Sequence, residues 1–312
     1  MKMKAIVYNK YGPPEVLNIK TIDKPVPKDN EVLIKIMATT VHVGDTRMRS
    51  FRVPLLMWLP SRFFLGLRKP KRSILGMEVS GIIEDIGKDI KRFKKGDEVF
   101  ALTGFNFGGY AEYMCLQVER SNEKQGMIAL KPSNVSFEEA AAVPAGALTA
   151  FAHMEKIDLN KGDHILIYGA SGSIGTYAVQ LAKYFGATVT GVCSSKNVGL
   201  VKSLGADNVI DYTKEDFTRC DKSYDVVFDA VFKMKKSQAK KALKKHGLYD
   251  SAHSSVSDST IDDFLFLKKL IEKNKLKPVI DRCYPMEEIV KAHRYVDKGH
   301  KVGNVVITIS QQ

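Results

Sequence analysis

The sequence predicts an α/β protein with two domains, the first β-rich and barrel-like, the second built on a doubly wound parallel sheet. Three observations favour this fold class. Before residue 130, short apolar or alternating runs are separated by glycine and proline turns, as at residues 12–14 and 95–97. After residue 163, strand-like and helical segments alternate. The length of 312 residues is sufficient for two domains of ordinary size.

The first domain is expected to contain five short strands. They lie at residues 4–8, 32–40, 79–86, 98–102 and 110–116. After them, Ser136 and Glu139 have the spacing of a capping box and predict the start of an alanine-rich helix. Pro144 interrupts this helix, and a second helical stretch follows around residues 148–151. The segment has the character of a junction between domains.

Residues 163–186 carry the most informative pattern. The apolar run 164–168 predicts a buried strand, and Gly169, Gly172 and Gly175 follow it at intervals of three before a helical pattern begins. In this strand–turn–helix context, a glycine turn indicates a dinucleotide site, because bare backbone and a helix N-terminus suit a pyrophosphate. An ordinary strand-to-helix turn is the alternative.

The rest of the second half continues the alternation. Further strands are expected at residues 188–193, 208–212, 224–230 and 247–253, with helices between them. The end of the chain adds helices near residues 262–273 and 287–297, and strands at residues 278–281 and 302–309.

In a dinucleotide fold, the end of the second strand selects the cofactor. A carboxylate there would bind a free ribose 2′-hydroxyl and indicate NAD, but residues 193–196 contain none. The hydroxyl of Ser194 and the ammonium of Lys196 suit a 2′-phosphate, through charge-assisted hydrogen bonds. We therefore expect NADPH (NADP) rather than NADH. The alternative is that Lys196 is a surface lysine at the start of a helix.

Composition limits the class of protein. Hydrophobic residues make up 44% of the chain and charged residues 27%, values typical of a globular protein. The longest apolar stretch, residues 53–67, is too short to span a membrane and is broken by two prolines and Arg62. The N-terminus has no signal-peptide pattern. We therefore expect a cytoplasmic protein without a membrane partner.

The net charge of +13 raises the question of anionic partners. Basic residues concentrate at residues 62–72 and 233–245, but no nucleic-acid-binding motif accompanies them. An anionic cofactor or substrate explains part of the excess more simply than a nucleic acid, which is not expected as a partner. The four cysteines are widely spaced, at positions 115, 193, 220 and 283, and predict neither disulfides nor a zinc cluster.

Motifs along nearly the whole chain resemble one known family. They are residues 11–17 (YGPPEVL), 75–81 (LGMEVSG), 93–99 (FKKGDEV), 109–113 (GYAEY), 169–175 (GASGSIG), 204–207 (LGAD), 209–212 (VIDY) and 277–281 (KPVID). In this order, the set resembles the medium-chain dehydrogenase/reductase superfamily, and within it the zinc-free quinone oxidoreductase branch. The motifs are specific for the family, though not for one substrate.

The resemblance implies a GroES-like catalytic domain at residues 1–130, completed by the C-terminal tail from about residue 260 to 312. It places a Rossmann, NADP-binding domain at residues 131–259. It also implies the residues that bind the cofactor, which are Gly169, Ala170, Ser171, Gly172, Ser173, Ile174, Gly175, Ser194, Lys196, Tyr212, Gly303 and Asn304. Thr149 would lie near the nicotinamide and is a catalytic candidate. A homodimer is the assembly that the resemblance implies.

The resemblance also bears on metal binding. The zinc-bearing relatives place a Cys early in the first domain, a His before the Glu of a Gly-His-Glu motif, and a later Cys, which are ligands that zinc prefers. The matching stretches here are residues 41–45 (VHVGD), 76–78 (GME) and 145–147 (AGA). His42 alone is no substitute for that set, and the four-cysteine structural lobe is missing as well. We therefore expect no bound zinc.

Without a Lewis acid, a carbonyl must be polarised by hydrogen bonds, which suits quinones and α,β-unsaturated ketones. Zinc-free relatives often have Asn at the position of His42, in an Asn-x-x-Asp-x-x-x-Arg pattern that retains Asp45 and Arg49. His42 is a candidate to donate a hydrogen bond or a proton, since imidazole titrates near neutrality, and a structural role is equally compatible. Asp45 is a further catalytic candidate, although pairing with Arg49 is favoured for it. Tyr110 is expected to pack rather than react.

Two features depart from the family pattern or extend it. Phe232 and Lys233 follow Val231 where the family usually has glycines near the nicotinamide. Residues 53–71 contain aromatic and cationic side chains that suit a lip for a bulky or acidic substrate, with core packing or a dimer contact as the alternative. These side chains are Trp58, Arg62, Phe63, Phe64, Arg68 and Lys69.

The sequence therefore predicts a zinc-independent, NADPH-dependent oxidoreductase that transfers hydride to a quinone or an α,β-unsaturated carbonyl. The alternative is an NADPH-binding regulatory, scaffold or RNA-binding protein with little turnover. The basic excess, the replaced Asn and the altered turn at Phe232 favour that alternative. A zinc alcohol dehydrogenase is a third possibility.

Overall fold

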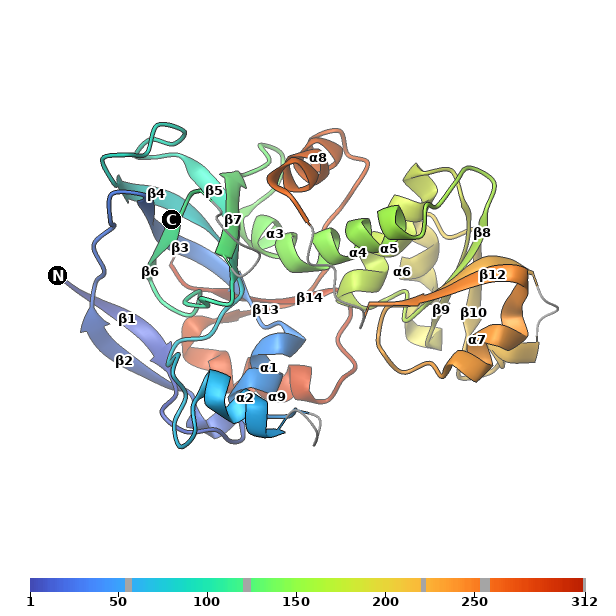
Figure 1. Ribbon diagram of the computed structural model, residues 1–312, viewed down its shortest axis with the longest axis horizontal. Coiled ribbons are helices and arrows are strands. Elements are labelled where there is room, and N and C mark those ends of the chain that lie inside the picture. Colours follow the sequence, from blue (N-terminus) through green and yellow to red (C-terminus); the bar gives the residue numbers. More distant parts are fainter. Residues whose placement is uncertain (54–57, 120–124, 220–222, 253–258, 311–312) are drawn as a thin grey trace. The chain divides into compact units, whose positions relative to one another are not determined.

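The computed structural model describes residues 1–53, 58–119, 125–219, 223–252 and 259–310, and Figure 1 shows its elements. The chain forms two compact units, Met1–Pro144 with Ile280–Gln312, and Ala145–Val279. They divide at residues 144 and 279, whereas the sequence suggested 130 and 259. The difference arises because helix α3 (Phe137–Ala141) packs on the sheet of the first unit, while helix α8 (Ile261–Glu272) belongs to the second.

The first unit is the expected β-rich domain. Its main sheet has the order β13-β14-β3-β4-β5-β7, with β6 paired to β3. These strands are β3 (Glu31–Thr40), β4 (Glu78–Ile86), β5 (Glu98–Gly104), β6 (Tyr113–Gln117), β7 (Gln125–Leu130), β13 (Ile280–Pro285) and β14 (Asn304–Thr308). β1 (Lys2–Val7) and β2 (Asn18–Asp23) form a separate antiparallel pair. Because β14 pairs with β3, the C-terminal tail becomes part of this unit, as expected.

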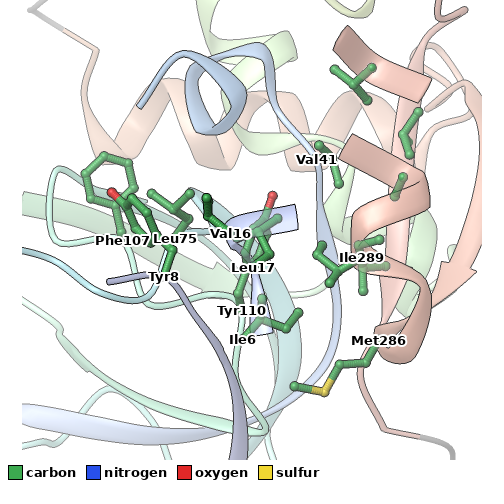
Figure 2. Packing of buried hydrophobic residues seen from close by; sticks show 14 residues of the cluster. Ile6, Tyr8, Val16, Leu17, Val41, Leu75, Phe107, Tyr110, Met286 and Ile289 are labelled. Atoms are coloured by element: carbon green, nitrogen blue, oxygen red, sulfur yellow. The ribbon is translucent and has the colours of Figure 1, made fainter. Parts of the chain in front are cut away.

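Helices pack on part of the first unit and contribute side chains to one of its apolar clusters. Besides α3, they are α1 (Val43–Ser50), α2 (Trp58–Leu65) and α9 (Ile289–Asp297). Helix α9 buries Ile289, Ala292 and Val296, which recur at helical spacing, against the fully buried Tyr110 (Figure 2). The ring of Tyr110 is thus packed in the core, as the sequence predicted.

The second unit is the expected parallel, doubly wound domain. Its sheet has the order β10-β9-β8-β11-β12, and every pairing is parallel. The strands are β8 (His164–Tyr168), β9 (Thr188–Cys193), β10 (Asn208–Asp211), β11 (Tyr224–Asp229) and β12 (Leu243–Ser251). The helices are α4 (Pro144–Lys156), α5 (Ser173–Tyr184), α6 (Val198–Ser203), α7 (Lys236–Ala242) and α8. The strand order reverses between β8 and β11, which is the topological switch point where α/β sheets bind ligands.

Some elements differ from the sequence-based expectation. Strands β2 and β7 and helix α1 were not expected, and β12 begins at Leu243 rather than at residue 247. Nearly every side chain of β2 is exposed, so the strand lacks the alternation that reveals half-buried strands. The capping box of Ser136 and Glu139 is present, and Pro144 begins α4 after α3 has ended. Within the described residues, no helix has both the length and the apolar character of a membrane span.

A buried acid–imidazole contact connects α4 to β12 inside the second unit. His153 Nδ1 lies 2.6 Å from Asp250 Oδ2, and Lys156 Nζ lies 3.1 Å from Asp250 Oδ1. Burial favours the protonated carboxyl, but the hydrogen bonds from His153 and Lys156 outweigh it and lower the pKa of Asp250 to about 2.

We expect Asp250→Asn to lower the free energy of unfolding by roughly 2 kcal/mol at neutral pH. The carboxyl has a pKa of 3.8 in its unperturbed state and about 2 in the folded chain, so its ionised form stabilises the fold above pH 3.8. That contribution is lost as the pH falls toward 2, and the two proteins should converge there. Urea unfolding of both proteins across this pH range measures the difference. A difference that is constant down to the lowest pH would contradict this account.

Candidate active site

A glycine turn follows β8 at the switch point of the second unit. Gly169 has a φ of +81°, and a Cβ on it would lie 2.4 Å from Cγ1 of Val231. A Cβ on Gly175 would lie 2.1 Å from the carbonyl oxygen of Gly169. The turn itself therefore requires both glycines, one for its left-handed backbone and one for close packing of α5.

The middle glycine has a different environment. A Cβ on Gly172 would come no closer than 3.4 Å to the surrounding protein, which is ordinary contact distance. Gly172 is the N-cap of α5 and makes no side-chain cap, and the N–H groups of Ile174 and Gly175 find no acceptor in the described residues. Unpaired N–H groups at the start of a twelve-residue helix attract an anion. The turn therefore has both space and donors for a pyrophosphate.

The other residues of the turn hold it in place. The side chain of Ala170 is buried, and its N–H donates to the carbonyl oxygen of Val192 at 3.0 Å. The hydroxyl oxygen of Ser171 accepts from Nδ2 of Asn197 at 3.0 Å, and Ser173 is the first residue of α5. Asn197, which the sequence analysis did not single out, thus connects the turn to the end of β9.

The residues expected at the 2′-phosphate lie at the ends of two adjacent strands, β9 and β10. The hydroxyl oxygen of Ser194 lies 3.4 Å from Nδ2 of Asn197. Lys196 is exposed, and Tyr212 is 50% exposed. Their polar groups therefore face solvent from one edge of the parallel sheet.

A carboxylate reaches the same edge from the neighbouring strand. Asp211 pairs in register with Cys193 and accepts hydrogen bonds from the hydroxyls of Ser195 and Thr213. These two bonds lower its pKa to about 2 and keep it ionised. Residues 193–196, at the end of β9, contain no carboxylate, as the sequence shows. The carboxylate comes from the end of β10, which the search of β9 alone did not cover. One oxygen of Asp211 is thus bound by Thr213 in its own loop, and the other by Ser195 in the segment that follows β9.

The loop after β11 packs on the glycine turn. The carboxylate of Asp229 accepts from the backbone N–H groups of Val231 at 3.0 Å and Met234 at 2.8 Å, which fixes the loop. Phe232 has a φ of +59°, a conformation that glycine adopts freely and an aromatic residue rarely. The loop therefore carries, in a left-handed backbone conformation, an aromatic side chain that is 37% exposed.

Thr149 lies on α4 within the second unit and is half-buried. A Cβ on Gly146, one turn earlier, would lie 2.9 Å from Ser173 Oγ, so this face of α4 packs on the start of α5. The candidate threonine and the glycine turn therefore belong to adjoining helices of one unit.

In the first unit, His42 is the N-cap of α1. Its Nδ1 accepts from the N–H of Gly44 at 3.0 Å, and its own N–H donates to Oδ2 of Asp45 at 3.0 Å, forming a capping box. Burial, with the positive charges of Lys301 and Arg47, lowers the pKa of His42 to about 4. The imidazole is thus neutral with its proton on Nε2, and the expected titration near neutrality is not found.

Asp45 is held by backbone rather than by an ion pair with Arg49. Its Oδ1 accepts from the N–H of Gly76 at 3.0 Å, and the hydroxyl of Tyr110 also bonds to it. Burial outweighs these bonds and raises the pKa of Asp45 to about 7. The expected pairing of Asp45 with Arg49 does not occur between these two described residues.

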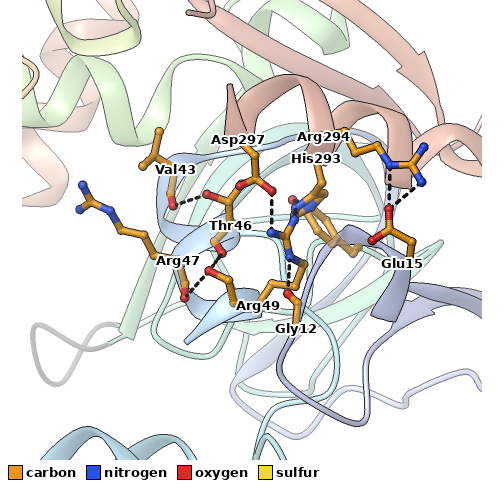
Figure 3. Close-up of polar contacts among 11 residues, drawn as sticks. Gly12, Glu15, Val43, Thr46, Arg47, Arg49, His293, Arg294 and Asp297 are labelled. Atoms are coloured by element: carbon orange, nitrogen blue, oxygen red, sulfur yellow. Dashed lines mark hydrogen bonds and ion pairs between the residues drawn. The ribbon is translucent and has the colours of Figure 1, made fainter. Parts of the chain in front are cut away.

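Arg49 instead begins a buried hydrogen-bonded chain (Figure 3). Its side chain bonds to Asp297 at 2.7 Å, to the carbonyl oxygen of Gly12 at 3.2 Å and to Nδ1 of His293 at 3.0 Å. Burial and Arg49 lower the pKa of His293 to about 3, so the ring is neutral. Because arginine only donates, Nδ1 accepts and Nε2 carries the proton.

The chain continues from His293 to Asp45. Nε2 of His293 lies 3.1 Å from the hydroxyl oxygen of Tyr110 and donates to it, which leaves the hydroxyl to donate to Asp45. Helix α9 is thereby connected to the first turn of α1, where His42 stands. His293 could not be recognised from the sequence, because its partners are distant in the chain.

The C-terminal tail adds a second basic side chain near His42. Lys301 donates to the carbonyl oxygen of Gly303 at 2.6 Å, and burial lowers its pKa to about 8, although Glu78 and Asp281 oppose the shift. Gly303 has a φ of +56°, and Asn304 is buried at the start of β14. The sequence analysis had assigned Gly303 and Asn304 to the cofactor and had not considered Lys301.

The expected lip has a different arrangement. The guanidinium of Arg62 lies 4.0 Å from the ring centroid of Phe51 and within about 5 Å of the rings of Tyr11 and Trp58. Phe63 is exposed, while the side chain of Phe64, like residues 54–57, lies outside the described residues. Arg62 is therefore stacked among aromatic rings rather than presented to solvent.

No group of three or more His, Cys, Asp or Glu side chains that could hold a metal occurs in the described residues. Three cysteines are free thiols, and Cys220 lies outside the residues that the structure describes. Among the positions that match the zinc ligands of relatives, only His42 is an imidazole. The side chains present do not fit a catalytic zinc.

Comparison with known proteins identifies the family. The alcohol dehydrogenase GroES-like domain matches residues 28–125, and two families described as zinc-binding dehydrogenase match residues 173–251 and 234–307. A 2-methylene-furan-3-one reductase from Solanum lycopersicum is 36% identical over 329 residues, which covers 98% of this chain and 79% of the reductase. The chain belongs to the medium-chain dehydrogenase/reductase superfamily.

Further superfamily members extend the similarity. An NADPH-dependent alkenal/one oxidoreductase (chloroplastic) from Arabidopsis thaliana is 33% identical and covers 98% of this chain and 79% of that protein. The structure of the quinone oxidoreductase from Coxiella burnetii aligns over 99% of this chain and 100% of its own, with 28% identity and a TM-score of 0.83. The expected family and fold class are confirmed, and this superfamily member is an oxidoreductase.

The second and third glycines of the pattern, Gly172 and Gly175, allow a matched test of the dinucleotide site. We expect Gly172→Ala to keep the thermal stability of the protein but weaken dinucleotide binding about tenfold or more, because its Cβ fits the fold and obstructs the ligand. Gly175→Ala should lower the free energy of unfolding by roughly 2 kcal/mol, because backbone must move. Thermal unfolding and titration calorimetry separate the two effects. A Gly172→Ala protein with unaltered dinucleotide affinity would place the ligand elsewhere.

Proposed function

We propose that the protein is a zinc-independent, NADPH-dependent reductase of quinones or α,β-unsaturated carbonyls. The observation that carries the proposal is the similarity, over 98% of the chain, to a reductase named for a conjugated ketone. The cofactor, when bound, supplies the hydride. The chain's own side chains then have to bind the substrate and stabilise its oxygen.

A preference for NADPH rests on the strand edge beside the glycine turn. Ser194 and Lys196 are available there for a 2′-phosphate, and the carboxylate of Asp211 is engaged by Ser195 and Thr213. The relative from Arabidopsis thaliana is named as NADPH-dependent, which supports the same preference. Tyr212 is the third side chain that we assign to the phosphate.

His42 is the side chain that we assign to the substrate oxygen. Its Nδ1 is engaged by the N–H of Gly44, so its Nε2–H is the group that donates. A neutral imidazole with a fixed tautomer polarises a carbonyl without giving up a proton, which suits an acceptor that is already activated. Asp45 acts indirectly, by holding the backbone of His42 in place. The proton that completes the reduction comes from water.

Assembly and location remain proposals based on the sequence. A homodimer is the default implied by the family, and light scattering of the purified protein would test it. A cytoplasmic location is likewise proposed, although some similar proteins are chloroplastic or mitochondrial.

The activity can be tested by measuring oxidation of NADPH and NADH with a panel of quinones and enones, before and after treatment with a zinc chelator. We expect turnover with NADPH, a clearly lower kcat/KM with NADH, and no loss after chelation, because the described residues contain no zinc ligand set. Tight NADPH binding without turnover of any acceptor would favour a regulatory protein instead. Loss of activity on chelation, with recovery on adding zinc, would revive the alcohol dehydrogenase alternative.

The pH profile tests the role of His42. If the neutral imidazole donates the hydrogen bond, kcat/KM is level between about pH 5 and 7 and falls only toward pH 4, where His42 becomes protonated. If an imidazolium were the acid, kcat/KM would already decline above its usual pKa of 6.5. His42→Ala should lower kcat about 100-fold at unaltered NADPH affinity, because one oxygen-binding donor is lost. An unaltered kcat would return His42 to a purely structural role.

A further inference from the structure

Lys301 and His42 belong to segments that are far apart in sequence but paired in the first unit. The N–H of Val41 donates to the carbonyl oxygen of Val305 at 2.8 Å, which aligns the segment before His42 with the start of β14. Lys301 precedes that strand, and its charge contributes to the lowered pKa of His42. The charge of Lys301 therefore acts on His42 from an adjoining segment of the same unit.

The ammonium of Lys301 is partly buried but has few hydrogen-bond partners. One of its three donors bonds to the carbonyl oxygen of Gly303 at 2.6 Å. No carboxylate forms an ion pair with it within the described part of the chain. Two donors and a full positive charge of Lys301 are thus left without a partner in the described residues.

The acidic groups around Lys301 favour its charged form, but none of them is paired with it in the described residues. Glu78 of β4 and Asp281 of β13 are the acidic groups that favour its charged form, and His42 at the start of α1 is neutral. The carboxylate of Glu78 is engaged by the Thr40 hydroxyl, and that of Asp281 by Tyr295 and the N–H of Val302. A partly desolvated cation beside a neutral donor is an arrangement that binds an anionic oxygen.

We propose that Lys301 is a catalytic residue which, together with the Nε2–H of His42, forms a two-donor site for the oxygen of the substrate as it becomes negative. The inference rests on the proposed function and names the group that replaces the missing Lewis acid. A metal cation and an ammonium both stabilise an oxyanion, but the ammonium needs no ligand set.

The electron balance of the step is simple. The β carbon of the enone gains a C–H bond with the electron pair of the dihydronicotinamide C–H bond, so the enone is reduced and the nicotinamide oxidised. The pair displaced from the C=C bond forms a double bond between the α carbon and the carbonyl carbon, and the π pair of the C=O bond moves to the oxygen, which gives an enolate. Lys301 and His42 each donate a hydrogen bond to that oxygen and keep their protons. Water then protonates the α carbon.

The test compares the wild-type protein with Lys301→Met, Lys301→Arg and the control Lys298→Met, using NADPH and 3-penten-2-one. Lys298 is exposed and only three residues away, so its loss controls for the general removal of positive charge. We expect kcat/KM to fall about 100-fold in Lys301→Met, to recover largely in Lys301→Arg, and to stay level in Lys298→Met. The affinity for NADPH, measured by fluorescence titration, should be the same in all four proteins.

A second readout does not depend on turnover. In an NMR titration of the imidazole, Lys301→Met should raise the pKa of His42, because a neighbouring cation has been removed. Lys298→Met should leave that pKa unaltered.

The possible failures are distinguishable. A wild-type protein that reduces no acceptor overturns the proposed function. An active wild type with an equally active Lys301→Met overturns this inference alone. Loss of NADPH affinity at constant kcat in Lys301→Met assigns the lysine to the cofactor instead and also overturns it. A His42 pKa that does not respond to Lys301→Met refutes the proximity on which the two-donor site depends.

Discussion

The first unit depends on one buried hydrogen-bonded chain from Arg49 through His293 and Tyr110 to Asp45. Arginine has donors only, so each bond in the chain has a fixed direction and each ring a fixed protonation. The chain fastens α9, from the C-terminal tail, to the first turn of α1. It is fully buried, so a missing member would leave its neighbours without partners and without water. The position of His42 follows from that constraint.

The two units present complementary chemistry. The second offers backbone N–H groups and a helix N-terminus, which suit the phosphates of a dinucleotide. The first offers an imidazole proton and an ammonium, which suit an oxygen atom that gains electron density. Neither set requires a metal. In the proposed reaction, hydrogen bonds and one positive charge take the place of a metal ion.

The parts of this picture that are local in sequence could be predicted, and those that depend on neighbouring strands could not. The left-handed turn at Gly169 and the close packing at Gly175 follow from a strand–turn–helix pattern, and the structure contains both. His42 was recognised from its place in a motif, but its lowered pKa depends on burial and on Lys301, which only tertiary structure brings near. The capping box at His42 escaped notice because histidine is not among the usual capping residues.

The hydrogen bond between Asp211 and Ser195 has a practical consequence for redesign. To change an enzyme from NADPH to NADH, a new acidic residue is commonly introduced at the end of the second strand. A new charge there can lower solubility or stability. In this chain an ionised carboxylate is already there, held by hydroxyl groups. Replacing Ser195 by a residue without a hydroxyl would release one of its oxygens for a ribose. At the proposed coenzyme site, the choice between the two coenzymes would then depend on which group binds the carboxylate of Asp211.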